Sequence, residues 1–157
     1  MTSIPPTQTW NCDSCRQPIA GHEGGWVEWQ TFQQAEDGNP SRGIGIRIVH
    51  RHGLGRDGTC QYNSHRRDGF MVSDGALSEF VGPDGLMDLL ELIQKEELPA
   101  SEVIELIKRI HVPGYEASRP HLNEAIRNGI IEINREDGFY SQDQLMSVLE
   151  WASRDPG

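Results

Sequence analysis

Cys12-Asp13-Ser14-Cys15, a Cys-x-x-Cys stretch near the N-terminus, presents two thiolates from one tight turn, which is half of a tetrahedral zinc site. The chain has one further cysteine, Cys60. Three cysteines, two of them three positions apart, make a poor disulfide framework and a good set of metal thiolates in a reducing compartment. The cysteines therefore predict a metal site that connects the N-terminus with the middle of the chain.

A histidine is the expected fourth ligand, because histidines flank Cys60 in the sequence. One face of a period-2 segment carries Ile44, Ile46, Ile48, His50 and His52. A strand that buries these isoleucines brings His50 inward from the same side. We predict a structural Zn²⁺ bound by Cys12, Cys15, His50 and Cys60. His52, and His65 in its Cys60-x4-His65 spacing, are the substitutes for the fourth ligand.

Two other motif interpretations have weaker support. A redox dithiol opens a helix after a strand, and the sequence around Cys12 lacks that pattern. The stretch Gly53-Leu54-Gly55-Arg56-Asp57-Gly58 matches the dinucleotide-binding pattern G-x-G-x-x-G, but the residues that follow it show no apolar helical stripe. We interpret these glycines as a flexible connection between the strands of the metal site.

A metal-dependent nuclease is a further alternative, because polar metal ligands crowd one region of the sequence. These residues are His50, His52, Asn63, His65 and Asp68. The predicted zinc site already uses part of this set, and no pair of acidic residues with a recognisable catalytic spacing accompanies it. We therefore expect a protein that is not an enzyme.

The N-terminal part is expected to be β-rich and zinc-stabilised. Residues 1–9 are rich in Pro and Thr and predict a flexible terminus, and Trp26-Val27-Glu28-Trp29-Gln30 alternates like a strand. Residues 53–75, rich in Gly, Arg, Asp and Ser, predict a loop region. With its knuckle at Cys12-x-x-Cys15, the subdomain of residues 10–75 resembles a treble-clef or zinc-ribbon fold.

The second subdomain, residues 76–157, is expected to be mainly helical. A helix starting near Asp84 carries Leu86, Leu89, Leu90 and Ile93 at helical spacing, and a second helix starts at Ser101. A third is expected from Pro120 to Asn128, followed by a hairpin of residues 130–140. A capping box, Ser141 to Gln144, opens the last helix. The whole chain is thus predicted to be an α+β protein.

This order of helices and hairpin over residues 84–153 resembles a winged-helix arrangement. The resemblance implies that the third helix enters the major groove of DNA and that the hairpin forms the wing. On this alternative, a transcriptional regulator, the base-reading residues are Arg119, His121, Asn123 and Arg127.

Charge argues for a different partner. The chain carries a formal net charge of −10, and residues 76–157 hold 16 acidic against 7 basic side chains. Such a surface repels phosphate backbones and favours basic proteins. No apolar run approaches the length of a membrane span, and the N-terminus lacks the pattern of a secretory signal. We expect a cytoplasmic, non-enzymatic protein-binding module with a basic partner, of the kind that an immunity or antitoxin factor has.

Overall fold

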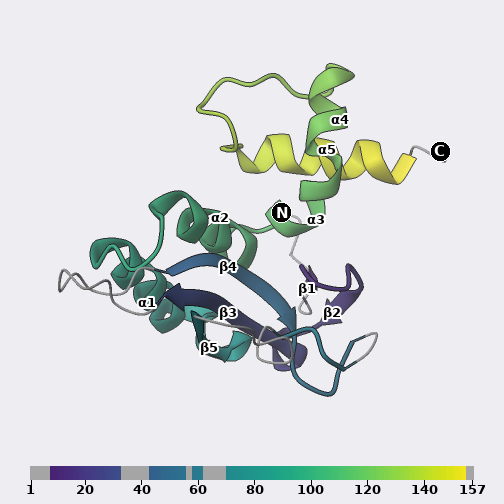
Figure 1. Cartoon of the computed structure of the whole chain (residues 1–157). Coiled ribbons are helices and arrows are strands. Elements are labelled where there is room, and N and C mark those ends of the chain that lie inside the picture. The colour runs from purple at the N-terminus through teal and green to yellow at the C-terminus, as the bar shows by residue number, and fades with distance from the viewer. Residues whose placement is uncertain (1–7, 33–42, 56–57, 62–69, 155–157) are drawn as a thin grey trace. The chain divides into compact units, whose positions relative to one another are not determined.

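The computed structural model describes residues 8–32, 43–55, 58–61 and 70–154. These residues form a mixed α+β protein, as predicted, and the chain divides into two compact units between His111 and Val112 (Figure 1). The N-terminal unit contains β1 (Thr9–Asn11), β2 (Pro18–Ala20), η1 (His22–Gly24), β3 (Gly25–Phe32), β4 (Gly43–His50), β5 (Phe70–Ala76), η3 (Leu77–Glu79), α1 (Gly82–Gln94) and α2 (Ala100–His111). The C-terminal unit contains α3 (Tyr115–Ser118), η4 (Arg119–His121), α4 (Leu122–Arg127) and α5 (Gln142–Arg154).

A three-stranded antiparallel sheet of order β4-β3-β5 is the centre of the N-terminal unit. The central strand β3 includes the predicted alternating segment, and its Val27 and Trp29 are buried. A separate two-stranded hairpin, β1 with β2, carries the Cys-x-x-Cys turn between its strands. The predicted strand at residues 26–30 is therefore confirmed.

In β4, the predicted single inward face is only partly correct. Ile48 and His50 are buried, but Ile44 is 43% exposed, and Val49 on the opposite side is 0% exposed. The register shifts between Glu28 and Gln30, so that two residues of β4 lie opposite one residue of β3. Such a β-bulge breaks the two-residue alternation, which explains why Ile44 does not share the face of Ile48.

The prediction that residues 53–75 contain no regular element is wrong at its C-terminal end. Phe70–Ala76 forms β5, which pairs with β3 along its whole length. Its central Ser73 and Asp74 are polar residues with low strand propensity, which hid the strand in the sequence. Non-local pairing with the buried central strand overrides that local preference.

The two helices α1 and α2 belong to the same core as the sheet, so the contacts do not follow the predicted boundary between residues 75 and 76. One cluster of buried side chains unites Val27 and Ile48 of the sheet with Leu89 of α1 and Leu106 of α2. The start of α1 is fixed by Gly85, where an added Cβ would lie 2.2 Å from the carbonyl carbon of Phe80. Only glycine permits this close packing of α1 on the chain before it.

The C-terminal unit has its own core. Its buried side chains are Tyr115, Leu122, Ala125, Ile131, Leu145 and Val148. The capping box is confirmed, since Ser141 N–H donates to Gln144 Oε1 at 2.9 Å and Gln144 N–H donates to Ser141 Oγ at 3.1 Å. The end of α4 at Asn128-Gly129 is also as predicted, with Ile130 N–H donating to the Ala125 carbonyl and Gly129 N–H to the Ile126 carbonyl.

The predicted wing does not form. Residues 128–141, all described, contain no strand. Ile131 is buried in the core instead, and the carbonyl of Glu132, which a hairpin would use, accepts a bond from Gln144 Nε2 at 2.7 Å. The expected third helix, Pro120 to Asn128, is also divided between the two short elements η4 and α4. The winged-helix resemblance therefore loses both its wing and a continuous recognition helix.

Among the helices of the described residues, none has the length and apolar character that crossing a membrane requires.

Candidate metal centre

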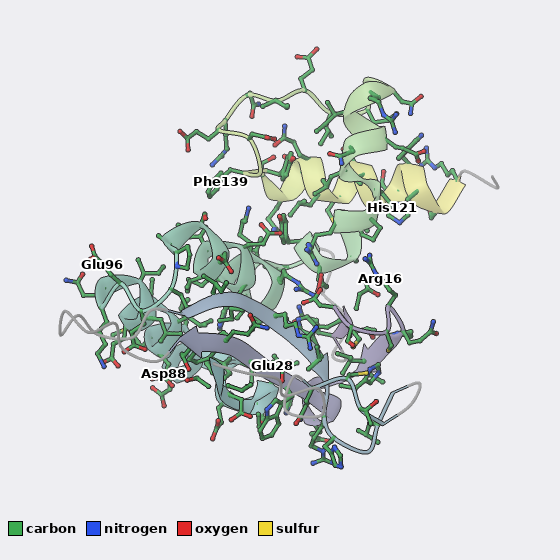
Figure 2. The ribbon with its side chains drawn as sticks, viewed as in Figure 1. Arg16, Glu28, Asp88, Glu96, His121 and Phe139 are labelled. Carbon is green, nitrogen blue, oxygen red and sulfur yellow. The ribbon has the colours of Figure 1, made fainter. Side chains whose placement is uncertain are left out.

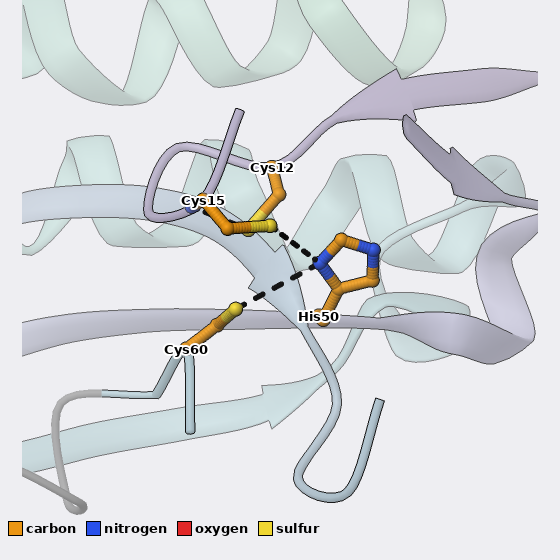
Figure 3. Close-up of side chains that lie close together, drawn as sticks. All are labelled: Cys12, Cys15, His50 and Cys60. Carbon is orange, nitrogen blue, oxygen red and sulfur yellow. Dashed lines mark hydrogen bonds between the residues drawn. The ribbon is translucent and has the colours of Figure 1, made fainter. Parts of the chain in front are cut away.

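Four side chains from three separated segments converge at one place. The ligand atoms of Cys12, Cys15, His50 and Cys60 all lie within 4.8 Å of one another and can hold a metal ion. Figure 3 shows the sulfur atoms gathered around the imidazole ring of His50. Cys12 is 1% exposed, Cys60 4% and His50 6%, and Cys15 is half-buried. The structure thus brings together the four residues that the sequence proposed as a set.

The first two thiols are positioned by the turn between β1 and β2. Cys12 N–H donates to the Gln17 carbonyl at 3.0 Å, and Arg16 N–H donates to the Cys12 carbonyl at 2.9 Å. The backbone N–H of Cys15 points at Cys12 Sγ, 3.5 Å away. An amide that faces a sulfur stabilises its thiolate form, so this turn already has the geometry of a metal-binding knuckle.

His50 is the last residue of β4, and its ring is oriented by a backbone carbonyl. Nε2 lies 3.1 Å from the Pro18 oxygen, while Nδ1 lies 3.3 Å from Cys15 Sγ and 3.8 Å from Cys60 Sγ. A carbonyl only accepts, so in the neutral ring Nε2 carries the proton and Nδ1 presents its lone pair to the sulfurs. A carbonyl partner of this kind is typical of metal-ligating histidines.

The glycine-rich stretch after β4 packs against the cluster at Gly55. Gly55 has φ +83°, and an added Cβ there would lie 2.7 Å from His50 Nδ1 and 3.0 Å from Cys60 Sγ. Gly53 N–H donates to the Gly58 carbonyl at 3.0 Å, which fastens the two ends of the stretch together. The absence of a side chain at Gly55 therefore lets the backbone pack directly on His50 and Cys60.

The concentration of sulfur atoms changes the chemistry of Cys60. Burial, followed by the hydrogen bond and the charge of Cys12 and then those of Cys15, raises the pKa of the Cys60 thiol to about 12. Without a cation, the Cys60 thiol therefore stays protonated near neutral pH. A divalent cation held by these residues would supply positive charge that favours the thiolate form, so its binding would release protons.

A second layer of contacts, not foreseen from the sequence, holds the knuckle on the sheet. Asp13 N–H donates to the Ile48 carbonyl at 2.8 Å, and Ile48 N–H donates to Asp13 Oδ2 at 2.8 Å. The same Asp13 oxygen accepts a bond from Nη1 of Arg109 in α2 at 2.7 Å. Arg109 is 3% exposed, and its Nη2 donates to the Asn11 carbonyl at 3.1 Å. Asp13 therefore covers the outer edge of β4 and connects the knuckle to α2.

Cys60 is held by a buried ion pair of the sheet. Glu28 in β3 is 0% exposed, and its Oε2 accepts bonds from Arg47 Nε at 2.9 Å and Nη2 at 2.8 Å. Arg47 Nη2 also donates to the Cys60 carbonyl at 2.9 Å. The charges of this pair satisfy each other away from water, and the pair fixes the backbone that carries the third thiol.

The remaining predicted site residues lie elsewhere. His52 is exposed in the turn after β4 and is not part of the cluster. His65, Asn63 and Asp68, which the substitute ligand and the nuclease alternative require, lie outside the described residues.

The four candidate DNA-reading residues are divided between short elements of the C-terminal unit. Arg119 and His121 belong to η4, and Asn123 and Arg127 to α4. Arg119 Nη1 binds Glu116 Oε1 at 3.0 Å, and Glu116 is 3% exposed. The guanidinium of Arg119 thus already neutralises a buried carboxylate, while Asn123 and Arg127 are exposed.

Signals for the second layer are weak in the sequence. Asp13 stands between two cysteines, where a polar residue is ordinary, and Arg109 lies between apolar residues of a helix without any motif of its own. Comparison of the chain with protein-family models, with curated proteins and with solved structures yields no match.

Proposed function

We propose that the N-terminal unit is a module stabilised by a structural Zn²⁺ bound to Cys12 Sγ, Cys15 Sγ, Cys60 Sγ and His50 Nδ1. The donor set is the observation that carries the proposal, because three thiolates and one imidazole are a standard tetrahedral zinc set. With ordinary zinc distances, a tetrahedron places sulfur and nitrogen ligands about 3.6 Å apart. The sulfur-to-Nδ1 separations of 3.3 Å and 3.8 Å lie on either side of that value.

A structural role fits better than a catalytic one. Four protein ligands complete the zinc coordination, whereas a catalytic zinc keeps one position open to water or substrate. Three of the four residues are buried, and Gly55 lies against His50 and Cys60. Zinc thiolates of this kind are stable in a reducing compartment, in agreement with a cytoplasmic location. The metal-dependent nuclease remains the less favoured alternative.

Metal content of the purified chain, expressed without a His-tag, tests the zinc proposal. We expect about one equivalent of zinc by elemental analysis and native mass spectrometry, and a fall below about a tenth of an equivalent in Cys12→Ser and Cys60→Ser. His22→Ala and His52→Ala, which change exposed histidines outside the cluster, are the matched controls and should keep the metal. Equal zinc content in the cysteine variants and the controls would contradict the proposal.

We further propose that the zinc-stabilised chain acts as a non-enzymatic protein-binding module with a basic partner, as an immunity or antitoxin factor would. Support comes from the net charge of −10 and from acidic side chains that are solvent-exposed in both units, such as Asp88, Glu91, Glu136 and Asp143. An acidic surface accelerates and orients the approach of a basic protein. A nucleic-acid-binding regulator is less favoured, because the same charges repel phosphate.

A further inference from the structure

One side of α1 exposes an apolar pair beside a row of carboxylates. Met87 is 65% exposed and Leu90 45%, although both are large apolar side chains on a regular helix. Asp84, Asp88 and Glu91 are exposed on the same helix. Asp84 lies three residues before Met87 and Glu91 four residues after it, so both carboxylates are neighbours of Met87 on the helix surface. Asp88 in turn lies four residues after Asp84 and three before Glu91, which continues the row of carboxylates. We name these five residues the α1 face.

Packing prevents the α1 face from turning inward. Leu89 is 0% exposed within the core, and Gly85, one helical turn earlier, lies against the backbone of Phe80. Gly85 and Leu89 together fix the rotation of α1 about its axis. Leu90, which the sequence pattern grouped with Leu89, is therefore held toward solvent.

The apolar part of this surface differs from isolated exposed residues, which are common on proteins. Met87 and Leu90 are three positions apart, so their side chains are neighbours and form one patch. Methionine is flexible and polarizable, and it is frequent on surfaces that accommodate partner side chains. A helix that presents apolar residues with this spacing is suited to pack against another amphipathic segment.

The charges around the pair define what that segment must carry. Asp84 and Asp88 are exposed one helical turn apart, and Glu91 Oε1 binds Lys95 Nζ at 3.0 Å. Lys95 is the only basic residue between positions 82 and 99, and Glu96 adds a further exposed carboxylate near the end of the helix (Figure 2). Phosphates of a nucleic acid or of an anionic membrane are repelled by such a surface.

We propose that the α1 face binds a basic amphipathic segment of a partner protein. The apolar residues of the segment cover Met87 and Leu90, while its Lys or Arg side chains pair with Asp84 and Asp88. The negative charge of the surface accelerates and orients the approach of the basic segment, and Met87 and Leu90 contribute most of the apolar surface area that becomes buried. This inference rests on the proposed protein-binding function and names the surface and the partner chemistry that serve it.

A synthetic helical peptide made of leucine and lysine in an amphipathic pattern tests the proposal. Titrated into the isotope-labelled, zinc-loaded full chain, it should shift the NMR amide signals of α1 and give a measurable dissociation constant. The variants Met87→Ser and Leu90→Ser should weaken binding about tenfold, and Asp88→Asn should reduce its dependence on salt. Ile133→Ser, which changes a side chain 50% exposed outside the α1 face, is the matched control and should bind like the parent.

Other outcomes overturn the proposal. A scrambled peptide of the same composition that binds as tightly would show charge attraction without a defined face. Signal shifts confined to other elements, equal losses in Met87→Ser and Ile133→Ser, or α1 shifts caused by duplex DNA or by anionic lipid vesicles would each contradict it.

Zinc content, measured on every variant, separates this inference from the proposed metal site. Binding by a chain that lacks zinc would support the α1 face and overturn the structural metal. Full zinc content without peptide binding would overturn the α1 face alone.

Discussion

At the scale of the residue, the absence of a side chain at Gly55 matters as much as the presence of the ligands. Its backbone approaches His50 and Cys60 so closely that a Cβ has no room, and its φ of +83° is strained for other residues. Gly53 has a similar φ of +89°, but an added Cβ there would meet nothing within 4 Å. Substitutions at the two glycines therefore distinguish two effects. Backbone strain is common to both positions, whereas contact with the candidate metal site occurs at Gly55 alone.

Gly55→Ala is expected to weaken zinc binding about ten- to a hundredfold, which is the usual effect of disturbing the surroundings of a metal ligand. Gly53→Ala should lose about 1 kcal/mol of unfolding free energy from the backbone strain and keep its zinc affinity. Competition with a chromophoric chelator measures the affinities, and urea unfolding measures the stabilities. Equal zinc affinities in the two variants would contradict a close contact of Gly55 with the ligands.

The four clustered residues could be predicted from the sequence because few types of side chain bind metal ions and the chain has three cysteines. The residues that hold these four in place could not be predicted. Asp13, Arg109 and Gly55 become important only through contacts with residues distant in sequence. His50 was favoured over His52 on strand periodicity. That reasoning selected the clustered residue although the same periodicity failed at Ile44, on the other side of the bulge.

At the scale of the element, α2 is joined to the metal knuckle by a nearly buried ion pair. The side chain of Arg109 is 4% exposed and that of Asp13 28%. Removing one partner of such a pair leaves a charge in a poorly solvated place, and this costs more than the pair itself contributes. Docking of α2 and the orientation of Cys12 and Cys15 are therefore expected to depend on each other.

Asp13→Asn is expected to lower the unfolding free energy of the zinc-loaded chain by about 2 kcal/mol, less than for a fully buried pair because Asp13 is partly exposed. The new amide oxygen can still accept the Ile48 N–H, so the change isolates the charge. Urea unfolding of Asp13→Asn, Arg109→Met and the double variant gives the coupling energy.

Lys95→Met is the matched control, since its ion pair with Glu91 is exposed and screened by water, so that its loss should hardly change the unfolding free energy. Additive losses in Asp13→Asn and Arg109→Met would refute the coupling of the knuckle with α2.

Helices and strands with strong local patterns could be predicted from the sequence, and those made by distant partners could not. The capping box predicted the start of α5, and the alternation of apolar and polar residues at positions 26–30 predicted β3. In contrast, β5 has a polar centre and exists because β3 offers it a pairing edge. The predicted wing contains residues with high strand propensity. Ile131, however, is buried in the core of the C-terminal unit, and the segment around it forms no strand.

At the scale of the whole molecule, the two compact units have separate buried clusters. Cys12 and Cys60 belong to the cluster of the sheet, α1 and α2, while Leu145 and Val148 belong to that of the C-terminal helices. The sequence placed the division near residue 75 because composition changes there, from Gly-rich to Leu-rich. Composition reports local structure, whereas the division of the chain depends on which apolar faces pack together.

Removal of zinc by a chelator is expected to raise hydrogen exchange in the N-terminal unit and to leave α5 unchanged. The amides around Cys12 and Ile48 should lose protection, since their hydrogen bonds surround the metal site, while those around Val148 should keep it. Hydrogen exchange with mass spectrometry measures both units in one sample, and Cys12→Ser, which lacks the site, should not respond to the chelator. Equal loss of protection in α5 would contradict the independence of the two cores.

The four ligands also precede α1 and α2 along the chain, which has a consequence for synthesis. Residues 12 to 60 are synthesised before Leu89 and Leu106, which complete the core around the sheet. A growing chain adds about 5–20 residues per second. Several seconds therefore pass between the synthesis of the four residues and the completion of α1 and α2. A metal captured during that interval would hold β1, β2 and β4 in register and shield three thiols from oxidation, and the cell's zinc supply would then govern how much of the protein matures.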